Sequence, residues 1–277
     1  MTIARWLLAF ALCLALVLAE RANAEGTQAV SVTPLRRAHA HNDYLHARPL
    51  IDALDNGFCS VEADVFLVDG ELRVGHDRDK LRPGRTLQSL YLEPLRRRIR
   101  RGSVYDRPAR FILLVDIKAD GEKVYEVLRR VLPQYQTVLS SFERGRVYQR
   151  AITVILSGER PRAMLESETA RYAFLDGRLS DLEGEESRAP ASLMPLVSDN
   201  YGQHFRWDGR GAMPDEERQK LRAMAQKAHT QHHLLRLWAT PETPAAWGEL
   251  LDAGIDLINT DDLAGLRRFL LTRVATK

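Results

Sequence analysis

The stretch C-S-V-E-A-D-V-F-L-V, residues 59–68, decides the fold that this sequence predicts. Apolar residues occupy every second position from Val61 to Leu67, whereas Glu62 and Asp64 lie between them. A period of two is typical of a β-strand, because successive side chains point to opposite faces. We therefore predict a strand with one apolar face and with two carboxylates on the other face.

A second stretch repeats this pattern. F-I-L-L-V-D-I-K, residues 111–118, again alternates, and Asp116 and Lys118 share its polar face. Further strand signals follow along the chain, most of them separated by segments with helical periodicity. The main predicted strands end near His41, Asp64, Lys118, Leu156, Asp176, Asp199, Ala239 and Asp261. Eight strands alternating with helices predict an α/β fold, a single-domain (β/α)₈ TIM barrel over residues 37–277.

Turn and helix signals fill the segments between the strands. Asp69-Gly70 predicts a hairpin that leads toward His76. Thr243-Pro244 is typical of a helix start, because a hydroxyl caps the helix and proline is tolerated at the first helical position. Helical spacing of apolar residues also predicts helices over 49–56, 124–131, 215–229 and 263–270.

The N-terminal residues are typical of an export signal. Arg5 gives a positive charge ahead of the apolar run Trp6–Ala19, which is too short to span a bilayer comfortably. Ala22–Ala24 matches the small-residue pattern at which signal peptides are cleaved. We expect residues 1–24 to be a signal peptide cleaved after its last residue, residues 25–36 to be a linker, and the protein to be periplasmic or secreted. The alternative is a retained membrane anchor.

Overall charge gives little indication of a macromolecular partner. The chain has 277 residues, of which 28% are charged, and its formal net charge is only +3. Such a charge gives no reason to expect nucleic acid as a specific partner. The run R-R-R-I-R-R, residues 96–101, could make transient contact with anionic membrane headgroups, and the alternative is a solvated helix face. We expect a monomer.

Polar residues gather at the predicted carboxyl ends of the strands, where barrel enzymes carry their active sites. Three of them are the carboxylates Glu62, Asp64 and Asp116, which would repel one another unless a cation lay between them. All-oxygen ligation suits Mg²⁺ or Ca²⁺. The alternative is that these carboxylates form salt bridges with lysines and arginines of the barrel, above all with Lys118.

The stretch R-A-H-A-H-N-D-Y, residues 37–44, adds two histidines near the end of the first predicted strand. His39 and His41 would point to the same side of a strand. Two imidazoles and a carboxylate at a strand end make a plausible site for acid–base chemistry. The alternative is a polar loop with surface histidines.

Four motifs, in this order and at this spacing, resemble the phospholipase C-like phosphodiesterase superfamily. They are Ala40-His41-Asn42-Asp43-Tyr44, Val61-Glu62-Ala63-Asp64-Val65, Gly75-His76-Asp77 and Val115-Asp116-Ile117-Lys118. The superfamily includes glycerophosphodiester phosphodiesterases, phosphatidylinositol phospholipases C and the spider sphingomyelinase D group. The His-Asn-Asp-Tyr form is most similar to the group named after altered inheritance of mitochondria protein six. The glycerophosphodiesterases have Arg-Gly in place of Asn42-Asp43.

The resemblance implies a phosphoric diester hydrolase that depends on a divalent cation. It implies that His41 and His76 are the acid–base pair and that one Mg²⁺ or Ca²⁺ is bound by Glu62, Asp64 and Asp116. It also implies a phosphate and substrate pocket, for which we expect Lys118, Trp238, Asn42, His39 and Asp199. For His39 the alternative is a satisfied histidine of the core.

The expected substrate is a small-molecule or lipid phosphodiester, similar to a glycerophosphodiester. One rival function is a barrel that binds a phosphorylated ligand without turning it over. The other is a phosphomonoesterase, or another metal hydrolase on the same scaffold. Release of alcohol from diesters would distinguish the first rival, and preference for monoesters would distinguish the second.

Overall fold

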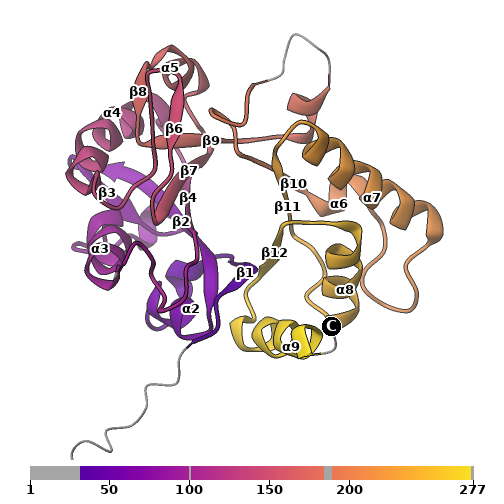
Figure 1. Cartoon of the computed structure of the whole chain (residues 1–277). Helices are drawn as coiled ribbons and strands as arrows, with labels where there is room; N and C mark the ends of the chain where they lie inside the picture. The colour runs from indigo at the N-terminus through magenta and orange to yellow at the C-terminus, as the bar shows by residue number, and fades with distance from the viewer. Residues whose placement is uncertain (1–31, 100, 184–188, 276–277) are drawn as a thin grey trace, which may run out of the picture. The chain divides into compact units, whose positions relative to one another are not determined.

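The described part of the chain contains eight parallel strands that close into a barrel (Figure 1), as the sequence predicts. Going round the barrel, the order is β1-β12-β11-β10-β9-β7-β4-β2, and β1 pairs with β2 to close it. The strands are β1 (Leu35–Ala40), β2 (Phe58–Val68), β4 (Phe111–Ile117), β7 (Ile152–Gly158), β9 (Ala173–Gly177), β10 (Leu196–Asn200), β11 (Leu234–Trp238) and β12 (Leu257–Thr260). Each predicted main strand is therefore present.

The computed structural model describes residues 32–99, 101–183 and 189–275. All elements described here belong to one compact unit, Thr33–Lys277. The predicted signal peptide and most of the predicted linker lie outside the described residues, so cleavage and a periplasmic or secreted location stay predictions. The predicted start of the barrel is two residues late, because β1 begins at Leu35 and Leu35 N donates to Gly57 O at 2.7 Å.

Helices follow most of the strands and lie outside the barrel (Figure 1). Thr243 caps α8 as predicted, since its Oγ1 accepts from Ala246 N at 3.2 Å and Pro244 occupies the first turn. The helices are α2 (Ile51–Asp55), α3 (Glu93–Arg98), α4 (Gly121–Val131), α5 (Arg162–Ser167), α6 (Tyr201–His204), α7 (Asp215–Thr230), α8 (Pro244–Ala253) and α9 (Leu263–Ala275). The short helical turns are η1 (Asp43–Leu45), η2 (Arg78–Lys80), η3 (Gln88–Leu92), η4 (Leu132–Tyr135) and η5 (Leu179–Leu182).

One hairpin extends the barrel sheet, and a second belongs to a small separate sheet. The predicted Asp69-Gly70 turn joins β2 to β3 (Glu71–Val74), which pairs antiparallel with it. Both turn residues have positive φ, 53° and 79°, a conformation that a hairpin turn demands and that aspartate and glycine accept readily. A separate antiparallel sheet is formed by β5 (Ser141–Glu143), β6 (Arg146–Tyr148) and β8 (Ala170–Arg171).

Along five strands, β4, β7, β9, β10 and β12, the same face of the sheet changes from apolar to polar. A buried apolar cluster is formed by Leu114, Ile155, Phe174, Leu196 and Leu257. Two residues farther along the same strands, and thus on the same face, stand Asp116, Ser157, Asp176, Ser198 and Asn259. The apolar layer packs the core, and the polar layer above it opens toward the carboxyl ends of the strands.

Among the described residues of the basic run at 96–101, the first three belong to α3. Arg96 Nη2 lies 2.7 Å from Glu93 Oε2, and Arg98 Nε donates to Val104 O at 3.1 Å. These contacts fit the solvated-face alternative, and contact with a membrane surface stays a prediction. No helix in the described ranges combines the length and the apolar character needed to cross a bilayer.

Candidate active site

A cavity of about 880 Å³ lies at the carboxyl ends of the barrel strands. We call it the main cavity. It is lined by seven residues that the sequence predicted for the site, namely His41, Asn42, Glu62, His76, Asp116, Lys118 and Trp238. Asp64 is fully buried and hydrogen-bonded to groups in this wall. The structure thus brings together the predicted catalytic and metal-binding residues.

Two other predicted residues lie outside the main cavity. Asp199 lines a neighbouring cavity of about 600 Å³ that shares Arg178 and Trp238 with it. The Asp199 carboxylate accepts from the backbone N–H groups of Leu179 and Asn200 at 3.3 and 2.8 Å. His39 is 0% exposed and has no surface with which to contact a substrate, which favours the core alternative.

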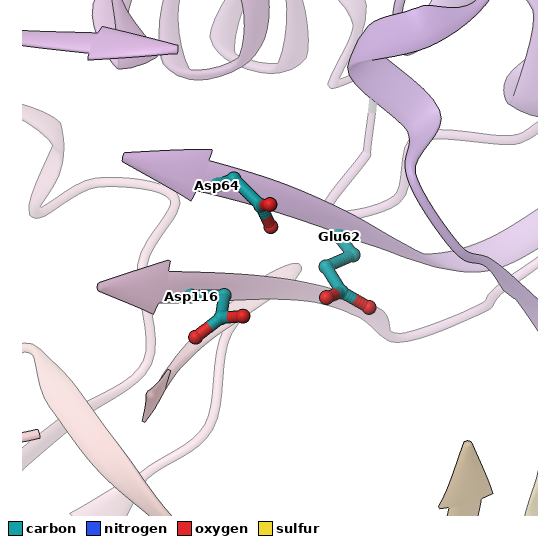
Figure 2. Close-up of side chains that lie close together, drawn as sticks. All are labelled: Glu62, Asp64 and Asp116. Carbon is teal, nitrogen blue, oxygen red and sulfur yellow. The ribbon is translucent and has the colours of Figure 1, made fainter. Parts of the chain in front are cut away.

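The three predicted metal ligands converge (Figure 2). Asp64 and Asp116 are direct neighbours in the parallel pairing of β2 and β4, and Glu62 precedes Asp64 by two residues on the same face. One carboxylate oxygen from each residue lies within 4.8 Å of the other two. Spacing of this kind lets one small cation touch all three side chains. We call these residues the carboxylate trio.

Lys118 forms the salt bridges that the sequence analysis gave as an alternative to the metal. Its Nζ lies 2.7 Å from Asp64 Oδ2 and 2.8 Å from Asp116 Oδ2. Tyr44 OH also donates to Asp64 Oδ2 at 2.7 Å. The two arrangements are compatible, because these contacts use only one oxygen of each aspartate.

The remaining oxygens support a cation site. Among the described residues, Asp64 Oδ1 and Asp116 Oδ1 are buried and have no hydrogen-bond partner. A buried acceptor without a donor is costly, and a bound cation satisfies it. Burial, together with the negative charges of Glu62 and Asp116, also raises the pKa of Asp64 to about 6, although Lys118 lowers it. The carboxylate trio therefore fits a divalent cation.

Glu62 is held by partners from the far side of the barrel. Arg236 Nη2 donates to Glu62 Oε2 at 2.5 Å, while Arg236 Nε donates to Asn259 Oδ1 at 2.9 Å. Although burial raises the pKa of Glu62, the charge of Arg236, the hydrogen bond and charge of His39 and the charge of His41 together outweigh it and keep this pKa well below its usual range. Glu62 is therefore ionised as it faces the cavity.

His39 is a second buried partner of Glu62. Its Nε2 lies 3.3 Å from Glu62 Oε2, and its Nδ1 lies 2.7 Å from Ser60 Oγ. Burial, with a further contribution from the charge of Arg236, lowers the pKa of His39 to about 3. His39 is consequently neutral and acts on the site only through Glu62.

His41 is oriented by a carboxylate that follows the last strand. Its Nδ1 lies 2.9 Å from Asp261 Oδ1, and Asn42 Nδ2 is 2.9 Å from the same nitrogen. Burial lowers the pKa of His41, but the hydrogen bond to Asp261 and the charge of Glu62 raise it more, so the net shift is upward. With Nδ1 facing Asp261, the Nε2 atom is left for chemistry.

His76 faces the main cavity from a different element. It follows β3, and its side chain is 59% exposed. His76 Nδ1 lies 3.1 Å from Asp77 Oδ1, and Lys80 Nζ donates to the other oxygen of Asp77 at 2.7 Å. The two histidines thus reach one cavity from separate loops, an arrangement that allows one to accept a proton and the other to deliver one.

Arg178 is a cavity residue that the sequence analysis did not select. Its Nη1 donates at 3.0 Å to Asp176 Oδ2, which also accepts from Ser157 Oγ at 2.7 Å. Asp176 is fully buried, so it fixes the guanidinium at the wall. The sequence does contain an indication of this role, because Asp176-Gly177-Arg178 places two opposite charges at a predicted strand end.

Gly158 leaves the space that Asp116 occupies. Its φ is +67°, and a Cβ on this residue would lie 2.1 Å from Asp116 Oδ1 and 2.2 Å from Ile117 O. Both its backbone conformation and this close approach require glycine. A larger residue at this end of β7 would therefore displace Asp116 of the carboxylate trio.

Asp43 of the His-Asn-Asp-Tyr motif is part of the scaffold. It is fully buried and accepts from Leu50 N at 2.5 Å and from Tyr91 OH at 2.9 Å. Its neighbour Asn42 has a positive φ of 47°, and Asn42 Oδ1 lies 2.7 Å from the Tyr44 hydroxyl. These bonds fix the turn that carries His41 and Tyr44 into the cavity wall.

The chain is similar to known proteins in sequence and in fold. Residues 27–176 match the AIM6-like phosphodiesterase domain, and residues 235–264 match the glycerophosphoryl diester phosphodiesterase family. Altered inheritance of mitochondria protein 6 of Eremothecium gossypii is 31% identical over 281 residues, which cover 86% of this chain and 70% of that protein. Its homolog in Arthroderma benhamiae is 31% identical over 258 residues, which cover 81% of each protein.

Solved structures share the barrel at lower sequence identity. A calcium-dependent phosphoinositol-specific phospholipase C from Pseudomonas sp. superposes with a TM-score of 0.55 at 13% identity, covering 86% of this chain and 93% of that one. A glycerophosphodiester phosphodiesterase from Parabacteroides distasonis superposes with a TM-score of 0.51 at 15% identity, covering 87% and 99%. These similarities establish the fold, and the sequence matches establish the family. The chain belongs to the AIM6-like phosphodiesterase family.

Proposed function

We propose that this protein hydrolyses a phosphodiester with the help of one divalent cation, Mg²⁺ or Ca²⁺, held by Glu62, Asp64 and Asp116. The observation that carries the proposal is the pair of buried aspartate oxygens without hydrogen-bond partners among the described residues, in a cavity lined by two histidines. When bound, the cation supplies positive charge beside a non-bridging phosphate oxygen. The remaining chemistry falls to the side chains of the cavity.

His41 is the proposed base. Its Nδ1 is engaged with Asp261, so its Nε2 takes the proton of the attacking hydroxyl or water. The attacking oxygen forms a bond to phosphorus while the bond from phosphorus to the leaving oxygen breaks. Because the pKa of His41 is raised, its neutral form gains population only as the pH rises through that higher value.

His76 is the proposed acid. It delivers a proton to the leaving alkoxide, which departs as an alcohol. Its position after β3 on an exposed loop gives it access to the mouth of the main cavity, through which the alcohol departs. After turnover, His41 releases a proton to solvent and His76 takes one up from solvent. Both residues thereby return to their starting states.

Lys118 is proposed to contact the phosphate. An ammonium group has three N–H donors, and two of them face Asp64 and Asp116. The third donor is free to meet a phosphate oxygen in the main cavity, which Lys118 lines. Arg178 and Trp238 line the same cavity and complete its phosphate and substrate wall.

Turnover of simple esters tests the proposal. We expect the metal-loaded protein to release choline or glycerol from glycerophosphocholine and nitrophenol from bis(p-nitrophenyl) phosphate. Nitrophenyl phosphate, a monoester, should react more slowly than the diester. Faster hydrolysis of the monoester would favour a phosphomonoesterase, and saturable diester binding without product would favour a non-catalytic binding protein.

A further inference from the structure

One wall of the main cavity is a single loop rich in basic residues. It runs from Gly75 to Arg85, and we call it the basic loop. Its base is closed by the hydrogen bonds from Val74 N to Arg85 O at 2.8 Å and from Gly75 N to Asp64 O at 3.1 Å. The loop contributes His76, Asp77, Lys80, Arg82 and Arg85 to the cavity lining. The proposed acid thus shares its loop with three cationic side chains that line the same cavity.

Most cations of the main cavity already face a carboxylate. Lys118 pairs with two aspartates of the carboxylate trio, Arg178 with Asp176, and Arg236 with Glu62. On the basic loop, Lys80 Nζ lies 2.7 Å from Asp77 Oδ2. These positive charges are therefore largely balanced within the protein.

Arg82 and Arg85 differ from the other cations. Within the described ranges neither guanidinium forms an ion pair with a carboxylate, although both line the main cavity. Among the described residues, the Arg85 side chain makes one hydrogen bond, from Nη2 to Tyr44 O at 2.8 Å, and the Arg82 side chain makes none. Guanidinium groups bind phosphate through two parallel N–H donors, and both arginines keep such donors free.

We propose that Arg82 and Arg85 bind a second anionic group, a phosphate monoester, carried by the leaving alcohol of the substrate. The inference rests on the proposed function, because it places the scissile diester at the carboxylate trio and the departing alcohol beside His76. The arginines stand on the same loop as His76, so a charged substituent on that alcohol would lie toward them. They therefore act as specificity residues and take no part in the chemistry.

A lipid surface is the other anion that could meet these arginines. Leu45, which also lines the main cavity, is 70% exposed and could enter such a surface. The position of Arg85 favours a substrate phosphate over a lipid surface. Arg85 is only partly exposed, and its side chain is fixed by a hydrogen bond to the backbone of Tyr44. A guanidinium held in this way within a cavity wall is preorganised for a small anion.

Two soluble diesters that differ by one phosphate test the inference. Glycerophosphoinositol and glycerophosphoinositol 4-phosphate contain the same diester, and only the second carries a phosphate monoester on the inositol. The expected ratio of their kcat/KM values is about tenfold or more in favour of the phosphorylated diester, because charge-assisted hydrogen bonds are strong. The Arg82→Gln variant should reduce that ratio about tenfold.

Arg78→Gln is the matched control. Arg78 belongs to the same loop, but it does not line the main cavity, and it lies over the Phe66 ring and 3.7 Å from Asp120. The control should keep the wild-type ratio. A wild-type ratio near one, or equal effects of the two substitutions, would overturn the inference.

The remaining outcomes distinguish failure of the inference from failure of the proposed function. Turnover of the unphosphorylated diester upholds the proposed function whatever the ratio, whereas no turnover of either diester contradicts both. An Arg82→Gln defect that appears on anionic phospholipid vesicles and leaves the soluble ratio unchanged would assign Arg82 to the lipid surface and would contradict the inference. A defect in the soluble ratio supports it.

Discussion

The His76→Ala variant is expected to hydrolyse an alkyl diester such as glycerophosphocholine about 10²–10⁴-fold more slowly than the wild type. An alkoxide is a poor leaving group and needs a proton in the transition state. A nitrophenolate does not, so the same variant should be only mildly slowed on bis(p-nitrophenyl) phosphate. The exposed position of His76, on a loop at the cavity mouth, suits a residue that serves the departing group.

His41→Ala provides the comparison. A base is needed for attack whichever group leaves, so this variant should be slow on both diesters. The measurement is kcat/KM for the two substrates with the wild type and both variants. If the variants exchange behaviours, the assignment of base and acid is reversed. If neither shows any dependence on the leaving group, the two histidines are not the acid–base pair.

Lys118→Met is expected to raise the activation free energy by about 2–4 kcal/mol, comparable to the loss of one preorganised donor. Methionine removes the charge and the donors while keeping a side chain of similar length. Because Lys118 Nζ also lies within 2.8 Å of two aspartates, its loss could instead alter metal affinity. Measuring kcat/KM against metal concentration separates the two effects.

Persistence of the Lys118→Met defect at saturating metal supports phosphate contact. Full rescue by added metal would contradict it and would assign Lys118 to charge balance. Lys123→Met is the matched control, since Lys123 is an exposed lysine of α4 that lies outside the main cavity, 3.5 Å from Asp120 Oδ1. The control should behave as the wild type.

Local patterns were enough to predict the barrel. Period-two alternation identified β2 and β4, and a strand's carboxyl end is where a parallel barrel places its polar side chains. The same alternation put Glu62 and Asp64 on one face, which the structure confirms, because one oxygen of each lies within 4.8 Å of the other and of Asp116. The hydrogen-bonded pairing of β2 with β4 then fixes the relative positions of the three carboxylates.

The partners of these residues could not be predicted in the same way. Arg236 and Glu62 are 174 residues apart, and His41 and Asp261 are 220 residues apart. Such contacts depend on which strands become neighbours or face each other once the barrel closes, and on side-chain lengths. The period-two alternation gives neither. A position at a strand end does not by itself place a side chain in the main cavity. The Asp199 carboxylate follows a strand as predicted, but it turns toward local backbone N–H groups.

The carboxylate trio is proposed to hold a divalent cation. Calorimetric titration with Mg²⁺ and with Ca²⁺ measures this binding in the metal-free wild type, in Asp64→Asn and in the control Asp199→Asn. Asp64→Asn removes a ligand charge from the site, whereas Asp199 is a strand-end carboxylate of the neighbouring cavity. Circular dichroism confirms that each variant is folded.

One cation should bind per wild-type chain, with affinity at least about tenfold weaker in Asp64→Asn and unchanged in Asp199→Asn. The absence of binding to the wild type, or equal affinities of the wild type and Asp64→Asn, would contradict the proposed cation site.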